Sequence, residues 1–319
     1  MRVIVVVKQS LRGLGDDYKI IKSIFESYGF EVIRKKNSSF LWLKNIFFKQ
    51  YDICIVLERP SLRWLLGGGY RIYQPNQEWL KEKKLWISRR YDLVWCKTRE
   101  SYLQLKKFNS SYNAEIIGFI SNNPIHNLDI SKANKEFLHI VGGSNAKGTV
   151  KLIQAWQNNP NWPILHIVSK RDFGEINEPN IKFYFGHLEE NKLEKLRLNC
   201  IFHIQPSEVE GWGHSPRISC KMGAINLITN APPFNEFFTK EFSFLIDSYE
   251  YKKQRLGRCF TYKISALENE VNKALKLSIS EIKTLSKISQ NQIKKNETNF
   301  FETFESSFQE ILKKHDSKS

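Results

Sequence analysis

Short apolar runs alternate with stretches of helical periodicity along the first third of the chain. Apolar residues three and four positions apart predict amphipathic helices over residues 17–28 and 100–108. Asp16 is placed to cap the first of these helices. Short apolar runs predict buried strands at residues 3–7, 52–57, 92–95 and 114–117.

A segment rich in Ser and Asn, residues 118–134, interrupts this alternation and is typical of a linker. Beyond it a helix is expected from Thr149, and strands are expected at residues 137–141, 164–168, 181–185, 201–204 and 225–229. Two blocks of alternating strands and helices predict an α/β protein with two Rossmann-like, doubly wound domains that face a cleft.

The predicted N-terminal domain covers residues 1–125, the second domain residues 126–290, and a C-terminal helix residues 291–319. Apolar residues at helical spacing predict that this last helix packs against a core: Phe301, Phe304, Phe308 and Ile311.

Composition fits this picture. With 319 residues, 41% apolar and 26% charged, the chain suits a globular protein of two domains. No apolar run reaches the roughly 18 residues of a spanning helix. The run at residues 3–7 is shorter than the about 7–15 residues of a secretory signal. Five cysteines scattered singly predict reduced thiols in a cytoplasmic protein, and they argue against a disulfide framework and a zinc site.

Positive charge is concentrated in the first part of the chain. Residues 1–120 hold 22 Lys+Arg and 11 Asp+Glu, a net charge of +11 out of +16 for the whole chain. This excess predicts an anionic partner, which can be a membrane surface, a phosphorylated acceptor or nucleic acid. The alternative is a Lys-rich genomic composition without functional meaning.

Ligands of doubly wound sheets bind outside the carboxyl ends of the strands, so the loops there are the candidate sites. The first is V-G-G-S-N-A-K-G-T, residues 141–149. Backbone amides of Gly142, Gly143 and Ser144 can approach an anion beside a helix N-terminus, and Lys147 supplies a mobile positive charge. The lysine precedes its glycine, so this is not a Walker loop. A plain tight turn is the alternative.

The second loop is S-E-V-E-G-W-G-H-S-P, residues 207–216, which leads into a helix expected near Ser215. Glycines on either side of a tryptophan leave amides available to a sugar or diphosphate. Glu210 can accept hydrogen bonds from sugar hydroxyls, and His214 can donate to a phosphate or sugar oxygen. Alternatively, the histidine is structural. The glycine-flanked turn consists of Gly211, Trp212 and Gly213.

A third loop, N-A-P-P-F-N-E at residues 230–236, is expected between a strand and a helix. Its Asn235 and Glu236 would face the same site as the first two loops. Three such loops on one sheet edge favour a ligand site over coincidence.

Together, the motifs G-x-S-x-x-K-G-T, P-S-x-x-E-G-W-G-H and A-P-P-F-N-E resemble the donor domain of GT-B glycosyltransferases, and most of all the large retaining family that uses nucleotide sugars. The resemblance covers residues 137–247. In the first block, V-L-E-R-P, I-Y-Q-P-N-Q-E-W and W-C-K-T-R are more weakly similar to the acceptor-side domain of some members. The resemblance to GT-B glycosyltransferases also implies that the C-terminal helix crosses back to the first domain.

The resemblance also implies roles for residues. Lys147 would contact the donor diphosphate, Glu210 would be the first glutamate of the family's E-x7-E element, and amides of residues 211–214 would hold the sugar and phosphate. Asn235 and Glu236 would lie near the donor. The second glutamate, usually a ribose ligand, is replaced by Ile218, and the arginine often found in the first loop is absent.

The first block adds few catalytic candidates. Gly13 and Gly15 are expected between the first strand and the first helix, where in a GT-B enzyme they would face the donor phosphates. Without a D-x-D pair, no metal or other cofactor is expected, in agreement with metal-independent GT-B chemistry. No histidine precedes His126, so Glu58 or Glu78 would be the base if one is needed.

The segment F-L-W-L-K-N-I-F-F-K, residues 40–49, interleaves apolar residues with lysines. It could lie on an anionic membrane, or it could be an ordinary helix that buries one face between the domains.

The leading hypothesis is a cytoplasmic, retaining glycosyltransferase, either free in the cytoplasm or peripheral on the inner face of the membrane. It would transfer a sugar from a nucleotide-sugar donor to an anionic acceptor: a lipopolysaccharide, a capsule or another lipid-linked glycan. One alternative is a DNA-modifying glycosyltransferase that acts on hydroxylated bases. Another, motivated by Ile218, is a degenerate protein that binds sugar nucleotides or glycans without turnover.

Overall fold

The computed structural model describes residues 1–7, 12–48, 50–67, 69–122, 124 and 126–316. They form two compact units. Unit 1 consists of Met1–Asn122, Lys253–Arg258 and Glu297–Ser319; unit 2 consists of Asn123–Lys252 and Cys259–Asn296. Each unit contains one six-stranded sheet whose strands are all parallel. The predicted α/β fold class with two doubly wound sheets is confirmed.

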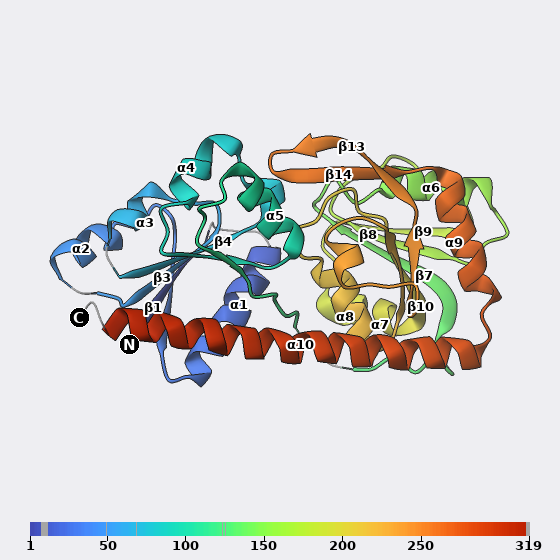
Figure 1. Cartoon of the computed structure of the whole chain (residues 1–319). Helices are drawn as coiled ribbons and strands as arrows, with labels where there is room; N and C mark the ends of the chain where they lie inside the picture. Colours follow the sequence, from blue (N-terminus) through green and yellow to red (C-terminus); the bar gives the residue numbers. More distant parts are fainter. Residues whose placement is uncertain (8–11, 49, 68, 123, 125, 317–319) are drawn as a thin grey trace. The chain divides into compact units, whose positions relative to one another are not determined.

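The sheet of unit 1 has the strand order β2-β1-β3-β4-β5-β6 (Figure 1). Its strands are β1 (Arg2–Val6), β2 (Glu31–Lys35), β3 (Ile53–Glu58), β4 (Tyr70–Pro75), β5 (Leu93–Cys96) and β6 (Ala114–Ile116). β3 and β5 are buried along their whole length, which explains why their sequences are continuous apolar runs. β2 and β4 were not predicted, because β2 is a half-exposed edge strand and β4 mixes tyrosines with Arg, Gln and Pro.

Helices α1 (Arg12–Ser27), α2 (Leu41–Phe47), α3 (Leu62–Leu66), α4 (Leu85–Ser88) and α5 (Arg99–Phe108) complete unit 1, together with the short helices η1 (Gln77–Trp79) and η2 (Glu82–Lys84). The helix expected over residues 100–108 is confirmed as α5. None of the seven residues of α2 is fully buried, and its face with Leu41 and Trp42 is partly buried against the core of unit 1.

Helix α1 corrects two predictions. It begins at Arg12, so Gly13 and Gly15 belong to the helix and not to a loop, and Asp16 does not cap it. The physical reason is Leu14, which is buried and extends the apolar stripe of the helix by one turn. That burial outweighs the about 1 kcal/mol by which each glycine disfavours a helix.

The sheet of unit 2 has the order β12-β11-β10-β7-β8-β9 (Figure 1). Its strands are β7 (Asn134–Gly142), β8 (Leu165–Ser169), β9 (Ile181–Phe185), β10 (Cys200–Gln205), β11 (Ile225–Thr229) and β12 (Ser243–Ile246). The five expected strands are confirmed, while β12 and the two-stranded hairpin of β13 (Ser248–Gln254) and β14 (Gly257–Tyr262) were missed. The helices are α6 (Thr149–Asn158), α7 (Glu190–Asn199), α8 (His214–Met222) and α9 (Ile264–Lys276).

The third loop does not lead into an α-helix as expected. It forms the short helix η3 (Phe234–Glu236), and the chain then continues into strand β12. Three phenylalanines at four-residue spacing, Phe234, Phe238 and Phe242, are all buried in one small cluster. Their burial holds the segment as a compact turn against the sheet.

The last helix, α10 (Ile279–Asp316), carries an apolar stripe that packs into unit 1 over its final part. Phe304, Phe308 and Ile311 are buried as predicted, but Phe301 is exposed and its neighbour Phe300 is buried instead. Phe300 lies four residues before Phe304 and therefore on the same helical face. None of the described helices is both long enough and apolar enough to cross a membrane.

Candidate functional site

In unit 2, the loops that follow β7 and β10 are joined to one another. The backbone amide of Glu208 donates to the carbonyl of Ala146 at 2.8 Å. The Nζ of Lys147 forms an ion pair with Oε1 of Glu210. These two side chains remain 18% and 15% exposed, so a ligand can still reach them. Two residues predicted from separate motifs therefore meet at the carboxyl edge of the sheet.

Two glycines permit this arrangement. Gly148 has φ = +67°, and a Cβ there would lie 2.3 Å from the carbonyl oxygen of Pro206. Gly213 has φ = +83°, and a Cβ there would lie 2.5 Å from the ring of Phe234. Any side chain at either position would push neighbouring loops apart.

The third loop packs against the second. The Trp212 ring contacts that of Phe237 edge-on, with centroids 5.1 Å apart, and Gly213 lies against Phe234. Because Trp212 is buried, its indole ring holds the turn in place, and its share in donor binding would come from the main chain. The guanidinium of Arg217 stacks on the Trp212 ring at 3.5 Å.

The remaining predicted donor residues lie in these loops. Gly143 and Asn235 are exposed, and Glu236 is partly exposed in η3. His214, also partly exposed, begins helix α8, directly after Gly213. Elsewhere in the same loops, Ser144 accepts a hydrogen bond from the Ala146 amide through its Oγ, while Gly142 ends β7 and Gly211 is buried in the second turn.

A buried histidine beneath these loops escaped sequence reasoning. His139 on β7 contacts the Ile204 carbonyl through Nδ1 at 2.8 Å and the Thr149 hydroxyl through Nε2 at 2.9 Å. Burial lowers the pKa of His139 to about 4, so the ring is neutral near pH 7. The neutral ring links β7, β10 and the start of α6, the three elements that carry the first two loops.

The hairpin of β13 and β14 also supports the loops that follow β7 and β10. The amide of Phe260 donates to the Glu208 carbonyl at 2.7 Å, and the Tyr251 hydroxyl donates to Oε2 of Glu208 at 2.7 Å. The hydroxyl of Tyr262 donates to the Gly148 carbonyl at 3.0 Å. These long-range contacts have no local sequence signal.

Unit 1 holds a basic cavity of about 880 Å³ at the carboxyl end of β3. One acidic residue, Glu58, is among the described residues that line it. Glu58 is buried with φ = +64°, an uncommon conformation for a residue other than glycine and one that often marks functional sites. Its Oε1 lies 2.8 Å from Nε of Arg59. The basic lining residues are Lys36, Arg59, Arg63, Lys81, Lys83 and Lys84.

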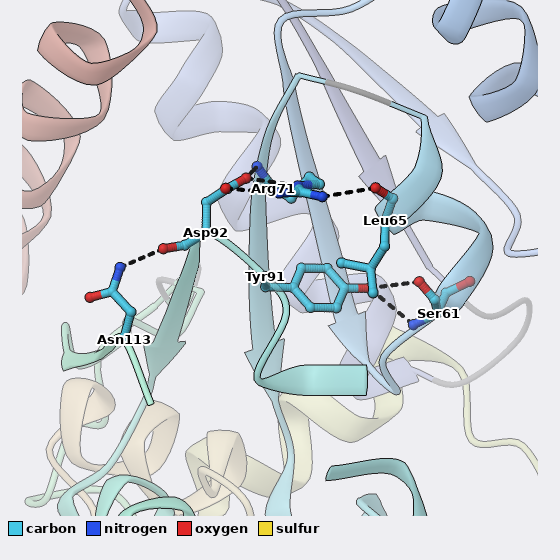
Figure 2. Close-up of polar contacts among 6 residues, drawn as sticks. All are labelled: Ser61, Leu65, Arg71, Tyr91, Asp92 and Asn113. Atoms are coloured by element: carbon cyan, nitrogen blue, oxygen red, sulfur yellow. Dashed lines mark hydrogen bonds and ion pairs between the residues drawn. The ribbon is translucent and has the colours of Figure 1, made fainter. Parts of the chain in front are cut away.

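Polar contacts anchor Ser61, which lines this cavity, and the nearby helix α3 (Figure 2). The Tyr91 hydroxyl accepts from the Ser61 amide at 2.9 Å and donates to the Ser61 carbonyl at 3.1 Å. Arg71 donates to both carboxylate oxygens of Asp92, at 2.8 and 2.9 Å, and to the Leu65 carbonyl at 2.9 Å. The turn after Glu58 and helix α3 are thereby held to β4 and to the residues that precede β5.

The site residues predicted in unit 1 do not all lie at the cavity. Glu58 lines the cavity, whereas the alternative base Glu78 lies in η1, where its carbonyl accepts from Arg255. Gly13 and Gly15 lie in helix α1.

Among the described residues, one group could offer three ligands to a metal: Glu136, His166 and Cys200. They lie near the amino ends of their strands, at the sheet edge opposite the loops that follow β7 and β10. His166 is already paired through both nitrogens, with Glu136 at 2.8 Å and with Tyr184 at 3.1 Å. Burial raises the pKa of Cys200 to about 12, which keeps it a thiol. These contacts fit a hydrogen-bonded cluster better than metal ligands.

No protein-family model and no curated protein matches the sequence. Solved structures do. Sucrose-phosphate synthase from Thermosynechococcus elongatus aligns with a TM-score of 0.74 at 10% identity, over 98% of this chain and 99% of that one. Anabaena HepE in complex with UDP and glucose aligns with a TM-score of 0.68 at 15% identity, over 96% and 99%. A glycosyltransferase from Rickettsia africae gives 0.72 at 12% identity, over 98% of both chains.

The chain therefore has the GT-B fold of these enzymes, and the resemblance noted in the sequence is confirmed at the level of the fold.

Proposed function

We propose that this protein is a glycosyltransferase that transfers a sugar from a nucleotide-sugar donor to an anionic acceptor. The observation that carries the proposal is the pairing of Lys147 with Glu210 where three loops meet at the carboxyl edge of the unit 2 sheet. This edge is where doubly wound sheets bind nucleotides. The complex of HepE with UDP and glucose supports a nucleotide sugar as the ligand.

The chemistry of the loops suits such a donor. The Lys147 ammonium can exchange its contact with Glu210 for one with a diphosphate, while Glu210 accepts hydrogen bonds from sugar hydroxyls. Helices α6 and α8 begin at this edge, and their N-terminal amides favour negative charge. We infer that these groups stabilise the departing nucleotide without a metal ion.

In the reaction, the bond between the sugar C1 and the donor phosphate oxygen breaks, and a bond from C1 to an acceptor hydroxyl oxygen forms. The hydroxyl proton passes either to the departing phosphate, with retention of configuration, or to the carboxylate of Glu58. Glu58 is the base candidate because it lines the cavity of unit 1. Six cationic side chains in that lining support an acceptor with phosphate or carboxylate groups, such as a lipid-linked glycan.

The test is release of free nucleotide from UDP-, GDP-, ADP- and CMP-sugars. Wild-type protein is expected to turn over at least one of them. Glu210→Gln should lower kcat by about 100-fold, in the range seen when a group that acts in the transition state is removed. Glu175→Gln, at an exposed position of unit 2, is the matched control and should keep the wild-type rate.

The isoleucine at position 218 supports a second candidate function, in which the protein binds nucleotide sugars without turning them over. An isoleucine cannot accept hydrogen bonds from ribose hydroxyls. Tight binding with no turnover, or a weak activity that Glu210→Gln leaves unchanged, would favour this second function. Absence of both binding and turnover across the panel would exclude both functions.

A further inference from the structure

Helix α2 turns its apolar side to solvent. Its polar residue Asn45 points inward, where Nδ2 donates to the Gly67 carbonyl at 2.6 Å and Oδ1 accepts from the Tyr51 amide at 2.9 Å. Trp42 packs partly against the core of unit 1. The outward residues of α2 and its flanks are apolar and between 44% and 73% exposed: Phe40, Leu43, Ile46, Phe47 and Phe48.

Helix α3 extends this surface. The two helices pack side by side in unit 1, as Figure 1 shows, and Leu62 and Leu66 of α3 are 43% and 57% exposed. The Arg63 guanidinium lies 5.9 Å from the centroid of the Phe40 ring and so links the two helices. These seven exposed apolar residues form what we call the α2–α3 surface. Contiguous apolar surfaces of this kind mark interaction sites with proteins or membranes.

The charged residues around the α2–α3 surface indicate what kind of partner it binds. No Asp or Glu occurs in residues 35–51 or in residues 59–77, the two sequence segments that contain α2 and α3. Apart from Arg71, which is paired with Asp92, the same segments carry six positive residues: Lys35, Lys36, Lys44, Lys49, Arg59 and Arg63. Aromatic and aliphatic residues among lysines and arginines, without acidic residues, complement an anionic lipid surface.

The α2–α3 surface is also continuous with the basic cavity. Lys36 and Ser38, which line the cavity, lie five and three residues before the start of α2. Leu62 belongs to both the surface and the cavity lining, and its neighbour Arg63 lines the cavity as well. A lipid phosphate in the headgroup layer would therefore lie beside the cavity when the surface rests on a bilayer.

We propose that the α2–α3 surface docks unit 1 onto an anionic bilayer, with the exposed phenylalanines in the interface and the basic cavity open to a lipid-linked phosphate. This inference rests on the proposed function only for the identity of the acceptor. Docking itself follows from exposure and charge. The bilayer is favoured over a protein partner because the surface combines its apolar side chains with cations from both segments and no acidic residue.

The test is co-sedimentation of the full chain with vesicles of phosphatidylcholine plus phosphatidylglycerol, and with vesicles of phosphatidylcholine alone. Wild type is expected to bind the anionic vesicles, and Phe47→Ser/Phe48→Ser should reduce the partition coefficient by about 100-fold, since each phenylalanine transferred from water contributes roughly a factor of ten. Lys44→Gln should reduce it about 5-fold on anionic vesicles only. Phe185→Ser removes an equally exposed phenylalanine from unit 2 and should have no effect.

Two results would overturn docking: wild type that ignores anionic vesicles, or a Phe47→Ser/Phe48→Ser variant that still binds them as wild type does. If wild type does not bind vesicles but self-associates, and the Phe47→Ser/Phe48→Ser variant does not self-associate, the surface would instead be assigned to a second copy of the chain. Salt-sensitive binding to duplex DNA in place of vesicles would assign the positive charge to nucleic acid. Nucleotide release, measured without vesicles, should be unchanged in the variant, so failure of docking and failure of the glycosyltransferase proposal remain distinguishable.

Discussion

Gly148 lies where the loop after β7 contacts the loop after β10, so replacing it tests whether the close approach of these loops matters. Gly148→Ala places a methyl group 2.3 Å from the backbone oxygen of Pro206 and 3.0 Å from the Tyr262 hydroxyl. The backbone oxygen cannot move aside as the end of a flexible side chain could. The substitution must therefore separate the loop after β7 from the loop after β10, or shift the start of helix α6.

The expected loss in the free energy of unfolding of Gly148→Ala has two parts. An alanine at φ = +67° costs about 1–2 kcal/mol in backbone conformation. Forcing a methyl group into a filled site costs about 1–3 kcal/mol more. The sum is about 2–5 kcal/mol. In a folding unit of this size each kcal/mol lowers Tm by about 2–4 °C.

Gly142→Ala is the matched control. Gly142 has a similar φ of +62°, but a Cβ there has no described atom within 4 Å. It should show the backbone cost alone, about 1–2 kcal/mol. Urea unfolding and thermal melts of both variants give the difference, and donor affinity should fall further in Gly148→Ala. Equal destabilisation by the two substitutions would refute the claim that loop contact at Gly148 is tight.

Further predictions concern charge and protonation. Burial lowers the pKa of His139 and of His203, a second buried histidine on β10, to about 4. Each neutral ring contributes its full stability above about pH 6.5, and this contribution is lost as the pH falls through about 4. Together they should make the free energy of unfolding fall by about 3 kcal/mol per pH unit between about pH 6 and 4.5, as checked by urea unfolding; a flat profile would contradict this. Lys147→Met should weaken donor binding about 10–100-fold in calorimetry, whereas Lys195→Met, on an exposed lysine of helix α7 in unit 2, should not. Glu58→Gln should slow transfer to an acceptor about 100-fold while leaving donor hydrolysis intact, and equal losses in both assays would remove Glu58 as the base.

Local patterns sufficed for much of the fold. Apolar runs located the strands that are buried on both faces, such as β3 and β11, because burial leaves no polar alternation to confuse the pattern. Edge and mixed strands, β2 and β4, lack that signal. The start of α1 was misplaced because two glycines suggested a loop, whereas the burial of Leu14 decides the helix.

The residues of the candidate site likewise divide into those that local sequence patterns predict and those that they do not. Lys147 and Glu210 could be found from short motifs, since each lies in a loop after a buried strand. Short motifs could not identify His139, Arg217 and Tyr251, because the partners of these residues are distant in sequence or depend on how the turn folds. The ring of Trp212 is buried and serves packing, so the predicted role of this residue in donor binding would fall to its main-chain amide.

The most direct test of the central claim is calorimetric titration of the wild-type chain and of Lys147→Met with UDP-, GDP-, ADP- and CMP-sugars. We predict saturable binding of at least one nucleotide sugar by wild type, and an affinity at least about ten-fold lower in the variant. Binding that Lys147→Met leaves unchanged would contradict the account, because the donor would then lie away from the paired loops of unit 2.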